Sequence, residues 1–335
     1  MIGADDTDRR SRLRALKLQT LVRDHLGSPV AAAPGVFPLG AAFELDAVAW
    51  VLLEDDPARG LGPALAWAIR NGADRLQLLA ATETGVLARR AEHFRLPIDV
   101  WHVEDRALLP AVAELALPPP EPSDSHLALI PTIVAGGAVA VVEHGVVSGE
   151  VRGLEVCRVA DDPHTDAVRL EVGVGAHDRE AFAIIHGDVP TVDALGGVVD
   201  AVRAHRSPGA PHPLNRLAPE RLLRWRLEQE PSLIGLASLT PTQPPVPRRN
   251  VKDHTPCSAI GRRADGTEVL VVCSVGVDLD LIPYAIDARL HVPGVDGEVV
   301  GPEAMVVLPS RDLVPVTADL AGLADQTLSL VTVSG

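Results

Sequence analysis

Three apolar runs decide the fold of the N-terminal part of the chain: AVAWVLL (47–53), RLQLLA (75–80) and IDVWHV (98–103). Short runs of this apolar content are typical of strands in a parallel sheet that is buried on both faces. The segments between them, 61–71 and 84–94, have the spacing of amphipathic helices, and Asn71-Gly72 is a typical helix end. The alternation predicts a βαβαβ unit with parallel strands and right-handed crossovers.

This predicted unit, residues 41–117, is Rossmann-like, and residues 1–40 precede it as a helix and a linker. The loop after its first strand, EDDPARGLGPA (54–64), contains two glycines but neither GxGxxG nor the P-loop pattern GxxxxGK[ST]. Its three acidic residues would repel a phosphate group at the start of the following helix. The sequence therefore favours a structural or small-ligand role for this unit over dinucleotide binding.

A proline run, PPPEP (118–122), separates this unit from a middle segment with a different pattern. Strand-like runs come first and helical patterns follow; the strands are expected at 138–142, 153–159 and 168–174 and the helices at 178–186 and 191–205. We expect a middle α+β segment over residues 123–206 with antiparallel strands. A further α/β unit is expected over 214–335, so the overall fold class is α/β.

The last third begins with a helix, PERLLRWRLEQEPSLIG (219–235), that has proline at its first turn and is ended by Pro231. Two strands joined by an Asp265-Gly266 hairpin turn follow it. The complete expected order is helix, strand 257–262, strand 268–275, helix 280–289, strand 304–308, helix 314–323 and strand 328–333.

This part of the chain resembles the PD-(D/E)XK (RecB-like) nuclease domain of the archaeal and actinobacterial mismatch endonuclease family. The resemblance covers residues 219–333 and depends on the element order and on one helix phrase, E-x-x-L-x-x-x-L-x-x-x-P-x-L-I-G. The residues that match this phrase are Glu220, Leu223, Leu227, Pro231, Leu233, Ile234 and Gly235.

The family's chemistry requires an Asp and a Glu or Asp that hold a divalent metal ion, and a Lys near the attacking water. The resemblance aligns these three positions with Ser258, Cys273 and Val275. Neither a hydroxyl nor a thiol replaces a hard carboxylate as a ligand of magnesium. The resemblance therefore implies a degenerate nuclease fold, and the leading hypothesis is a non-catalytic binding or scaffold protein.

Two catalytic alternatives remain open. The first is a metal-dependent nuclease with migrated active-site residues that uses magnesium or manganese; its candidate residues are Lys252, Asp253 and Glu268. The second is a hydrolase or lyase sited in the middle segment, with the candidates Glu155, Glu171 and His177. Glu155 and Glu171 lie mid-strand between apolar neighbours, and two inward-facing carboxylates would have to be paired or ligated.

The segment VDLDLIPYAIDAR (277–289) contains three aspartates and is the candidate metal-binding region, with Asp278 and Asp280 as its ligands. Asp278 also suits the N-cap of the helix that follows, and this structural role would explain the residue without a metal site.

The formal net charge of −15 disfavours general binding to nucleic acid, which would need a local basic patch. Four arginines give the candidate nucleic-acid-binding patch: Arg221, Arg224, Arg248 and Arg249. Because Arg221 and Arg224 lie one helical turn apart and share a face, they also suit an interdomain ion-pair surface.

Cysteine usage and hydropathy predict a cytoplasmic protein with no membrane segment. The three cysteines form no CxxC pair, and the N-terminus lacks the apolar core of a signal peptide. The most apolar stretch, 127–142, is short and interrupted by Pro131 and Gly136. The near absence of lysine indicates a bacterial source with GC-rich coding. A protein partner or a second copy of the chain remains an open expectation.

Overall fold

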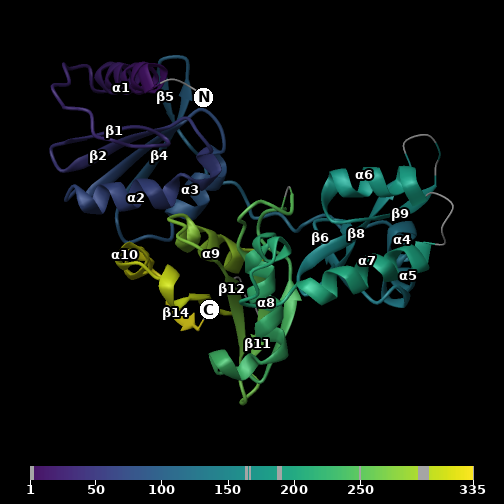
Figure 1. The fold of residues 1–335 in the computed structure, drawn as a ribbon. Helices are drawn as coiled ribbons and strands as arrows, with labels where there is room; N and C mark the ends of the chain where they lie inside the picture. The colour runs from purple at the N-terminus through teal and green to yellow at the C-terminus, as the bar shows by residue number, and fades with distance from the viewer. Residues whose placement is uncertain are drawn as a thin grey trace. The chain divides into compact units, whose positions relative to one another are not determined.

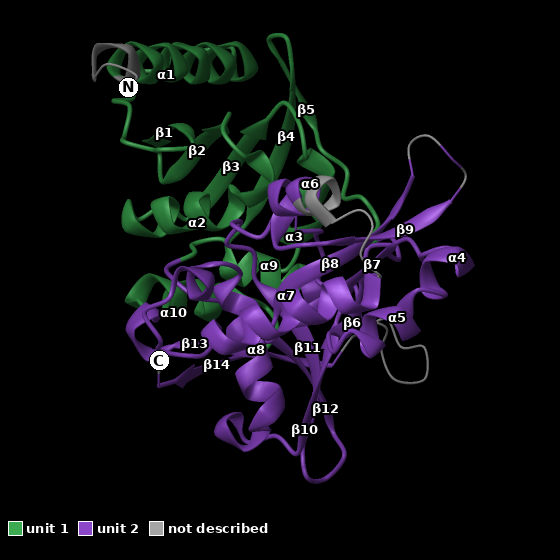
Figure 2. Cartoon of the chain, turned by 45° about the vertical axis from the view of Figure 1, so that its right-hand side comes forward, with its two compact units in different colours: residues 1–116, 278–287, 314–328 green, residues 117–277, 288–313, 329–335 purple. Residues whose placement is uncertain are grey.

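The computed structural model describes residues 4–162, 165, 167–186, 191–248, 250–292 and 302–334, except for the side chains of residues 4–7 and 182–186. These residues form α-helices and three β-sheets, so the predicted α/β class is confirmed (Figure 1). Contacts group them into two compact units (Figure 2). Unit 1 contains residues 1–116, 278–287 and 314–328, and unit 2 contains residues 117–277, 288–313 and 329–335.

The sheet of unit 1 has the strand order β1-β2-β3-β4-β5. Its strands are β1 Gly40–Leu45, β2 Val48–Leu53, β3 Arg75–Ala80, β4 Ile98–Glu104 and β5 Ala107–Pro110. The three central strands are parallel and the two edge strands are antiparallel to their neighbours. The predicted alternation of parallel strands and helices is thus present from β2 to β4, and the two edge strands were not predicted.

Helices cover both faces of this sheet. α1 Ala4–Leu26 lies on one face, and α2 Leu61–Arg70 and α3 Thr84–Ala91 lie on the other (Figure 1). The α1 face is closed by apolar side chains of helix and sheet, among them Leu18, Val22, Phe43, Trp50 and Leu79. A short 3-10 helix, η1 Pro57–Arg59, precedes α2.

Two helices from the last third of the sequence belong largely or wholly to unit 1: α9 Leu281–Leu290 and α10 Pro315–Leu323. The start of α2 approaches the residues before α9 so closely that a Cβ atom at Gly62 would lie 1.9 Å from the Leu279 carbonyl oxygen. Only glycine fits this contact, and the Gly62 amide donates to Asp280 Oδ1 at 3.0 Å.

Unit 2 contains an antiparallel sheet of order β6-β7-β8-β9. Its strands are β6 Val139–Glu143, β7 Val146–Val151, β8 Leu154–Asp161 and β9 Val168–Val172. Its helices are α4 Asp124–Leu127, α5 Ile130–Ala135, α6 Gly175–His186 and α7 Thr191–His205. The antiparallel pairing agrees with the prediction for the middle segment, but β7 was not predicted.

The second sheet of unit 2 has the order β10-β11-β12-β13-β14. Its strands are β10 Ser238–Thr242, β11 Cys257–Arg262, β12 Glu268–Cys273, β13 Glu303–Pro309 and β14 Leu328–Val333. β10 to β12 pair antiparallel, and β12 pairs parallel to β13. α8 Pro219–Gln229 contributes Leu223 and Leu227 to the core of this sheet. The short 3-10 helices are η2 Pro213–Arg216, η3 Pro231–Ile234 and η5 Ser310–Asp312.

None of the helices within the described ranges combines the length and apolar character that crossing a bilayer requires.

Candidate functional site

The candidate site of unit 2 is built around two arginines of α8. The helix buries its leucines against the β10–β14 sheet, so Arg221 and Arg224, which are spaced three residues apart, share another face. Both side chains are buried, with 5% and 2% of their area exposed. A buried guanidinium is costly unless it is paired, so these two arginines require carboxylate partners.

The partners are two glutamates of the β6–β9 sheet. Arg221 donates to Glu143 of β6 and to Glu150 of β7. Arg224 Nη2 donates to Glu150 Oε2 at 3.3 Å, and its Nε lies 3.1 Å from Glu228 Oε1. Burial would raise the pKa of Glu150, but the charges of Arg221, Arg224 and Arg248 outweigh it and hold that pKa below its ordinary value.

A second group of ion pairs surrounds Glu155 of β8. Arg158 binds this carboxylate through two nitrogens at 3.0 and 2.9 Å. Arg179 of α6 donates to Oε1 at 2.8 Å, and Arg248 donates to Oε2 at 3.3 Å. One carboxylate is therefore shared by three arginines, of which Arg179 also lies 3.6 Å from Glu171.

Arg206 is fully buried and fixes the backbone of the residues that precede α8. It donates to the carbonyl oxygens of Arg152, Leu214, Leu217 and Ala218 at 2.6 to 3.0 Å. Burial lowers the pKa of Arg206 to about 10, so the side chain stays charged at neutral pH. Nearby, Gly153 has a φ of +74° and packs against the Arg221 backbone. A Cβ atom at this position would lie 2.4 Å from the Arg221 carbonyl oxygen.

A cavity of about 610 Å³ opens beside these two groups of ion pairs. Its charged lining comes from Glu143, Glu155, Arg158, Arg221 and Arg248, and its other lining residues are Pro120, His144, Val146, Ser148 and Pro247. Arg248 Nη1 and Glu143 Oε1 are buried atoms that make no hydrogen bond within the described part of the chain. The residues that line the cavity therefore include one donor and one acceptor that no described residue satisfies.

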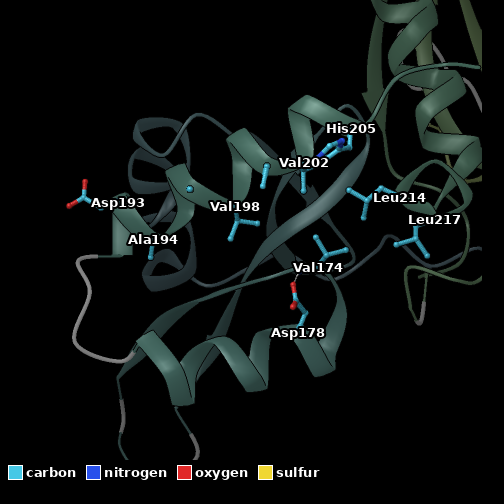
Figure 3. Close-up of a pocket in the computed structure, with 11 residues that line it drawn as sticks. Val174, Asp178, Asp193, Ala194, Val198, Val202, His205, Leu214 and Leu217 are labelled. Carbon is cyan, nitrogen blue, oxygen red and sulfur yellow. Dashed lines mark hydrogen bonds between the residues drawn. The ribbon is translucent and has the colours of Figure 1, made fainter. Parts of the chain in front are cut away.

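A second hollow in unit 2, of about 780 Å³, is mainly apolar (Figure 3). Val174 and Asp178 lie on one side of it, and Val198 and Val202 of α7 lie on the other. The Asp178 carboxylate accepts a hydrogen bond from the Val174 amide at 2.7 Å and is occupied by that turn. This hollow holds no cluster of charged groups comparable with the first cavity.

The three positions that the nuclease resemblance aligns with catalytic residues lie at β11 and β12. Ser258 and Cys273 are fully buried, and Val275 packs against the core of the sheet. Cys273 faces Cys257 across the strand pair, and the hydrogen bond between the two thiols, together with burial, holds the pKa of Cys273 well above its ordinary value. Arg224 Nη1 donates to the Ser258 carbonyl oxygen at 3.4 Å.

The candidate residues for a nuclease with migrated active-site residues bind different partners and do not form one group. Asp253 accepts hydrogen bonds from the backbone and side chain of Asn250, and Lys252 lies exposed in the same turn. Glu268, at the start of β12, pairs with Arg262 across the hairpin. In the part of the chain that the structure describes, neither carboxylate forms an ion pair with Lys252 within 4 Å.

The middle-segment candidates are brought together only in part. Glu171 lies 3.6 Å from Arg179 Nε, so it joins the Glu155 group through a shared arginine. His177 is fully exposed on α6, with its ring 3.9 Å from Glu180. Glu155 thus faces inward and is paired, as the sequence requires of a buried carboxylate, but His177 does not approach it.

The metal candidates Asp278 and Asp280 lie in unit 1 and pair with different arginines. Asp278 binds Arg59 at 2.7 Å, whereas Asp280 is buried 3.3 Å from Arg90 Nη1. Burial raises the pKa of Asp280 to about 7 in spite of the Arg90 charge. Across the described ranges, no three His, Cys, Asp or Glu side chains gather in a metal-ligating group.

Of the four arginines predicted as a nucleic-acid-binding patch, Arg221, Arg224 and Arg248 are buried side chains that pair with carboxylates of the β6–β9 sheet. Arg249 lies outside the described residues. The sequence analysis did not single out the other members of the network, Glu143, Glu150, Arg158, Arg179 and Arg206. The usable signal was the recurrence of Glu and Arg inside otherwise apolar strands, since such residues must find one another once buried.

Searches with this chain found no matching family model, no similar curated protein and no similar solved structure. The interpretation of the site therefore rests on its own geometry.

Proposed function

We propose that this protein is a non-catalytic binding or scaffold protein whose last third keeps a PD-(D/E)XK-like frame without the metal chemistry of that family. The element order α8-β10-β11-β12-α9-β13, with β12 parallel to β13, supports the proposal of such a frame. The position of Arg224 carries the functional part of the proposal.

Arg224 places a guanidinium at the residue that the resemblance aligns with a metal-binding aspartate. Its Nη1 lies 3.4 Å from the Ser258 carbonyl oxygen, inside the core and away from screening water. A divalent cation placed there would meet the arginine charge without a carboxylate at Ser258 or Cys273 to bind it, and the nearby carboxylates of Glu150 and Glu228 are already paired with Arg224. This position is therefore occupied by an arginine–carboxylate network in place of a metal site.

A cleavage assay tests this proposal against the nuclease alternative. The full chain is incubated with labelled single-stranded, duplex and branched DNA in the presence of magnesium or manganese. Lys252→Ala and Glu268→Gln are assayed in parallel, and circular dichroism checks that each protein is folded. We expect no metal-dependent cutting by any of the three proteins. Cutting by the wild-type chain that both substitutions abolish would overturn the proposal and identify migrated catalytic residues.

A further inference from the structure

The cavity between the two groups of ion pairs in unit 2 has the features of a built ligand site. Its volume of about 610 Å³ falls within the range of about 300–1,000 Å³ that is usual for small-molecule pockets. Its charged side chains are held in place by ion pairs. Arg158 and Arg248 share Glu155, and Arg221 is fixed by Glu143 and Glu150.

One donor in this lining lacks a partner. The side chain of Arg248 has only 7% of its area exposed, and its Nη2 bonds Glu155, but its Nη1 donates no hydrogen bond to any described residue. A buried N–H group that is left unsatisfied costs about 1–3 kcal/mol, and more when the group is charged. Such a group beside a cavity is suited to receive an acceptor from a ligand.

The charge balance favours an anionic acceptor. Among the described residues, Arg158, Arg179 and Arg248 all bond the one carboxylate of Glu155; Arg179 also lies 3.6 Å from Glu171, and the charges of Glu143 and Glu150 act on Arg248 without a hydrogen bond. Burial, followed by the repulsion of Arg221, lowers the pKa of Arg248, so its charged form is disfavoured in this surrounding. A bound oxyanion would stabilise the charged form of Arg248 and satisfy Nη1 at the same time.

Two other lining residues offer acceptors. Glu143 Oε1 accepts no hydrogen bond from the described residues, although Arg224 Nη1 lies 3.6 Å away. The Nε2 atom of His144 lies 2.8 Å from the Pro244 carbonyl oxygen. Because a carbonyl oxygen only accepts, this nitrogen must carry the proton, and a neutral His144 presents Nδ1 as an acceptor.

We propose that this cavity binds a small organic molecule that carries an oxyanion, either a carboxylate or a phosphate, for Arg248 and Arg158, and an N–H or O–H donor for Glu143 or His144. The proposal deepens the proposed binding function by naming a ligand class. Its ligand test is separate from the cleavage assay, because no residue of the nuclease alternative lines the cavity.

Titration calorimetry with the full chain tests the proposal at fixed ionic strength. The probes are inorganic phosphate, adenosine monophosphate and glutamate, and sodium chloride is the control for bulk salt effects. We expect saturable binding of adenosine monophosphate or glutamate. Binding of the nucleotide and of phosphate identifies the oxyanion as a phosphate, and binding of glutamate alone identifies it as a carboxylate.

Arg248→Gln and Arg169→Gln form the matched pair of variants. Arg169 of β9 pairs with Glu171 and lies outside the cavity lining. We expect Arg248→Gln to weaken binding about tenfold or more, because a charge-assisted hydrogen bond is lost, and Arg169→Gln to leave it within about twofold.

Arg158→Gln is the second cavity variant and is used if Arg248→Gln does not fold. No saturable binding of any of the three probes overturns the proposal. Equal affinities of the wild-type and cavity-variant proteins overturn it as well, because the bound probe would then lie elsewhere on the chain.

Discussion

The two units both bury arginine–carboxylate networks, but they satisfy them to different degrees. In unit 1, Arg90 bonds Asp287 through Nε and Nη2 at 3.1 and 2.9 Å, and its Nη1 bonds the Ala58 carbonyl oxygen at 2.7 Å. Every nitrogen of this guanidinium has a partner. In unit 2, Arg248 has a nitrogen with none among the described residues, and that side chain lines a cavity.

The difference separates a structural network from one suited to binding. A saturated buried network fixes one arrangement of the elements that supply it, here α3 and α9. An unsaturated one retains a desolvation cost that a ligand can remove. We therefore expect the unit 1 network to stabilise the fold and Arg248 in unit 2 to contribute to binding. The substitutions below test this difference, from the largest expected effect to the smallest.

Asp287→Asn is expected to have the largest effect on stability. Asp287 is 1% exposed and pairs with both Arg89 and Arg90, so its loss leaves two buried guanidinium groups undercompensated. We expect the free energy of unfolding to fall by about 3–5 kcal/mol, measured by urea denaturation. Asp278→Asn is the control; its partner Arg59 is 46% exposed, and we expect a loss below about 1 kcal/mol. Equal losses in the two variants would contradict the comparison.

Arg206→Met is expected to have the next largest effect. This substitution keeps most of the side-chain volume but removes the donor of four carbonyl oxygens, of which that of Ala218 is fully buried. We expect a loss of about 3 kcal/mol in urea denaturation, since each unsatisfied group costs about 1–3 kcal/mol and part of this cost is relieved by relaxation. The matched control is Arg203→Met on α7, where the side chain is 49% exposed and about 1 kcal/mol or less should be lost.

The pH dependence of stability tests the buried Asp280. Its native pKa of about 7 lies above its ordinary value of 3.8, so the native protein holds a proton that the unfolded chain releases. The stabilisation is complete below about pH 4 and is lost as the pH rises through about 7, with a slope of at most about 1.4 kcal/mol per pH unit. Urea denaturation of wild-type and Asp280→Asn proteins at several pH values measures the free energy of unfolding. We expect this fall in stability between about pH 4 and 7 only in the wild type; the same pH dependence in both proteins would contradict the prediction.

Arg248→Gln should have the smallest effect on stability although it abolishes most of the proposed binding. Glu155 keeps Arg158 and Arg179 as partners, and an unsatisfied donor disappears. We expect the free energy of unfolding to change by less than about 1 kcal/mol in either direction. A loss as large as that of Asp287→Asn would show that Arg248 belongs to a structural network after all.

The elements that the sequence predicted well are those with a strong local signal. Strand 75–80, strand 257–262 and helix 191–205 match β3, β11 and α7 at both ends. The strands that were missed, β1, β5, β7 and β10, have weak apolar patterns or contain Gly, Ser or Pro, as in VVSGEV of β7. Such strands are stabilised by pairing with a neighbour in the sheet, and a local pattern does not contain that information.

For the site, the sequence showed which charged side chains would need partners if they were buried, but it did not show which residues those partners are. It showed that Glu155 would need a partner if it faced inward, and that Arg221 and Arg224 share one helix face. The choice between a solvent-exposed basic face and a buried one depended on Glu150, 71 residues before Arg221 in the chain. The sequence also did not show that most of α9 and all of α10 would belong to unit 1.

The sequence by itself therefore determined the α/β class, the parallel order of β2 to β4 and the acidic, lysine-poor composition, because these follow from residue periodicity and counting. Only the tertiary structure decided which charges were buried together and which donor was left over beside a cavity. Ion pairing inside a protein depends on distances of about 3 Å between atoms from distant segments, and these distances exist only after the sheets and helices have packed.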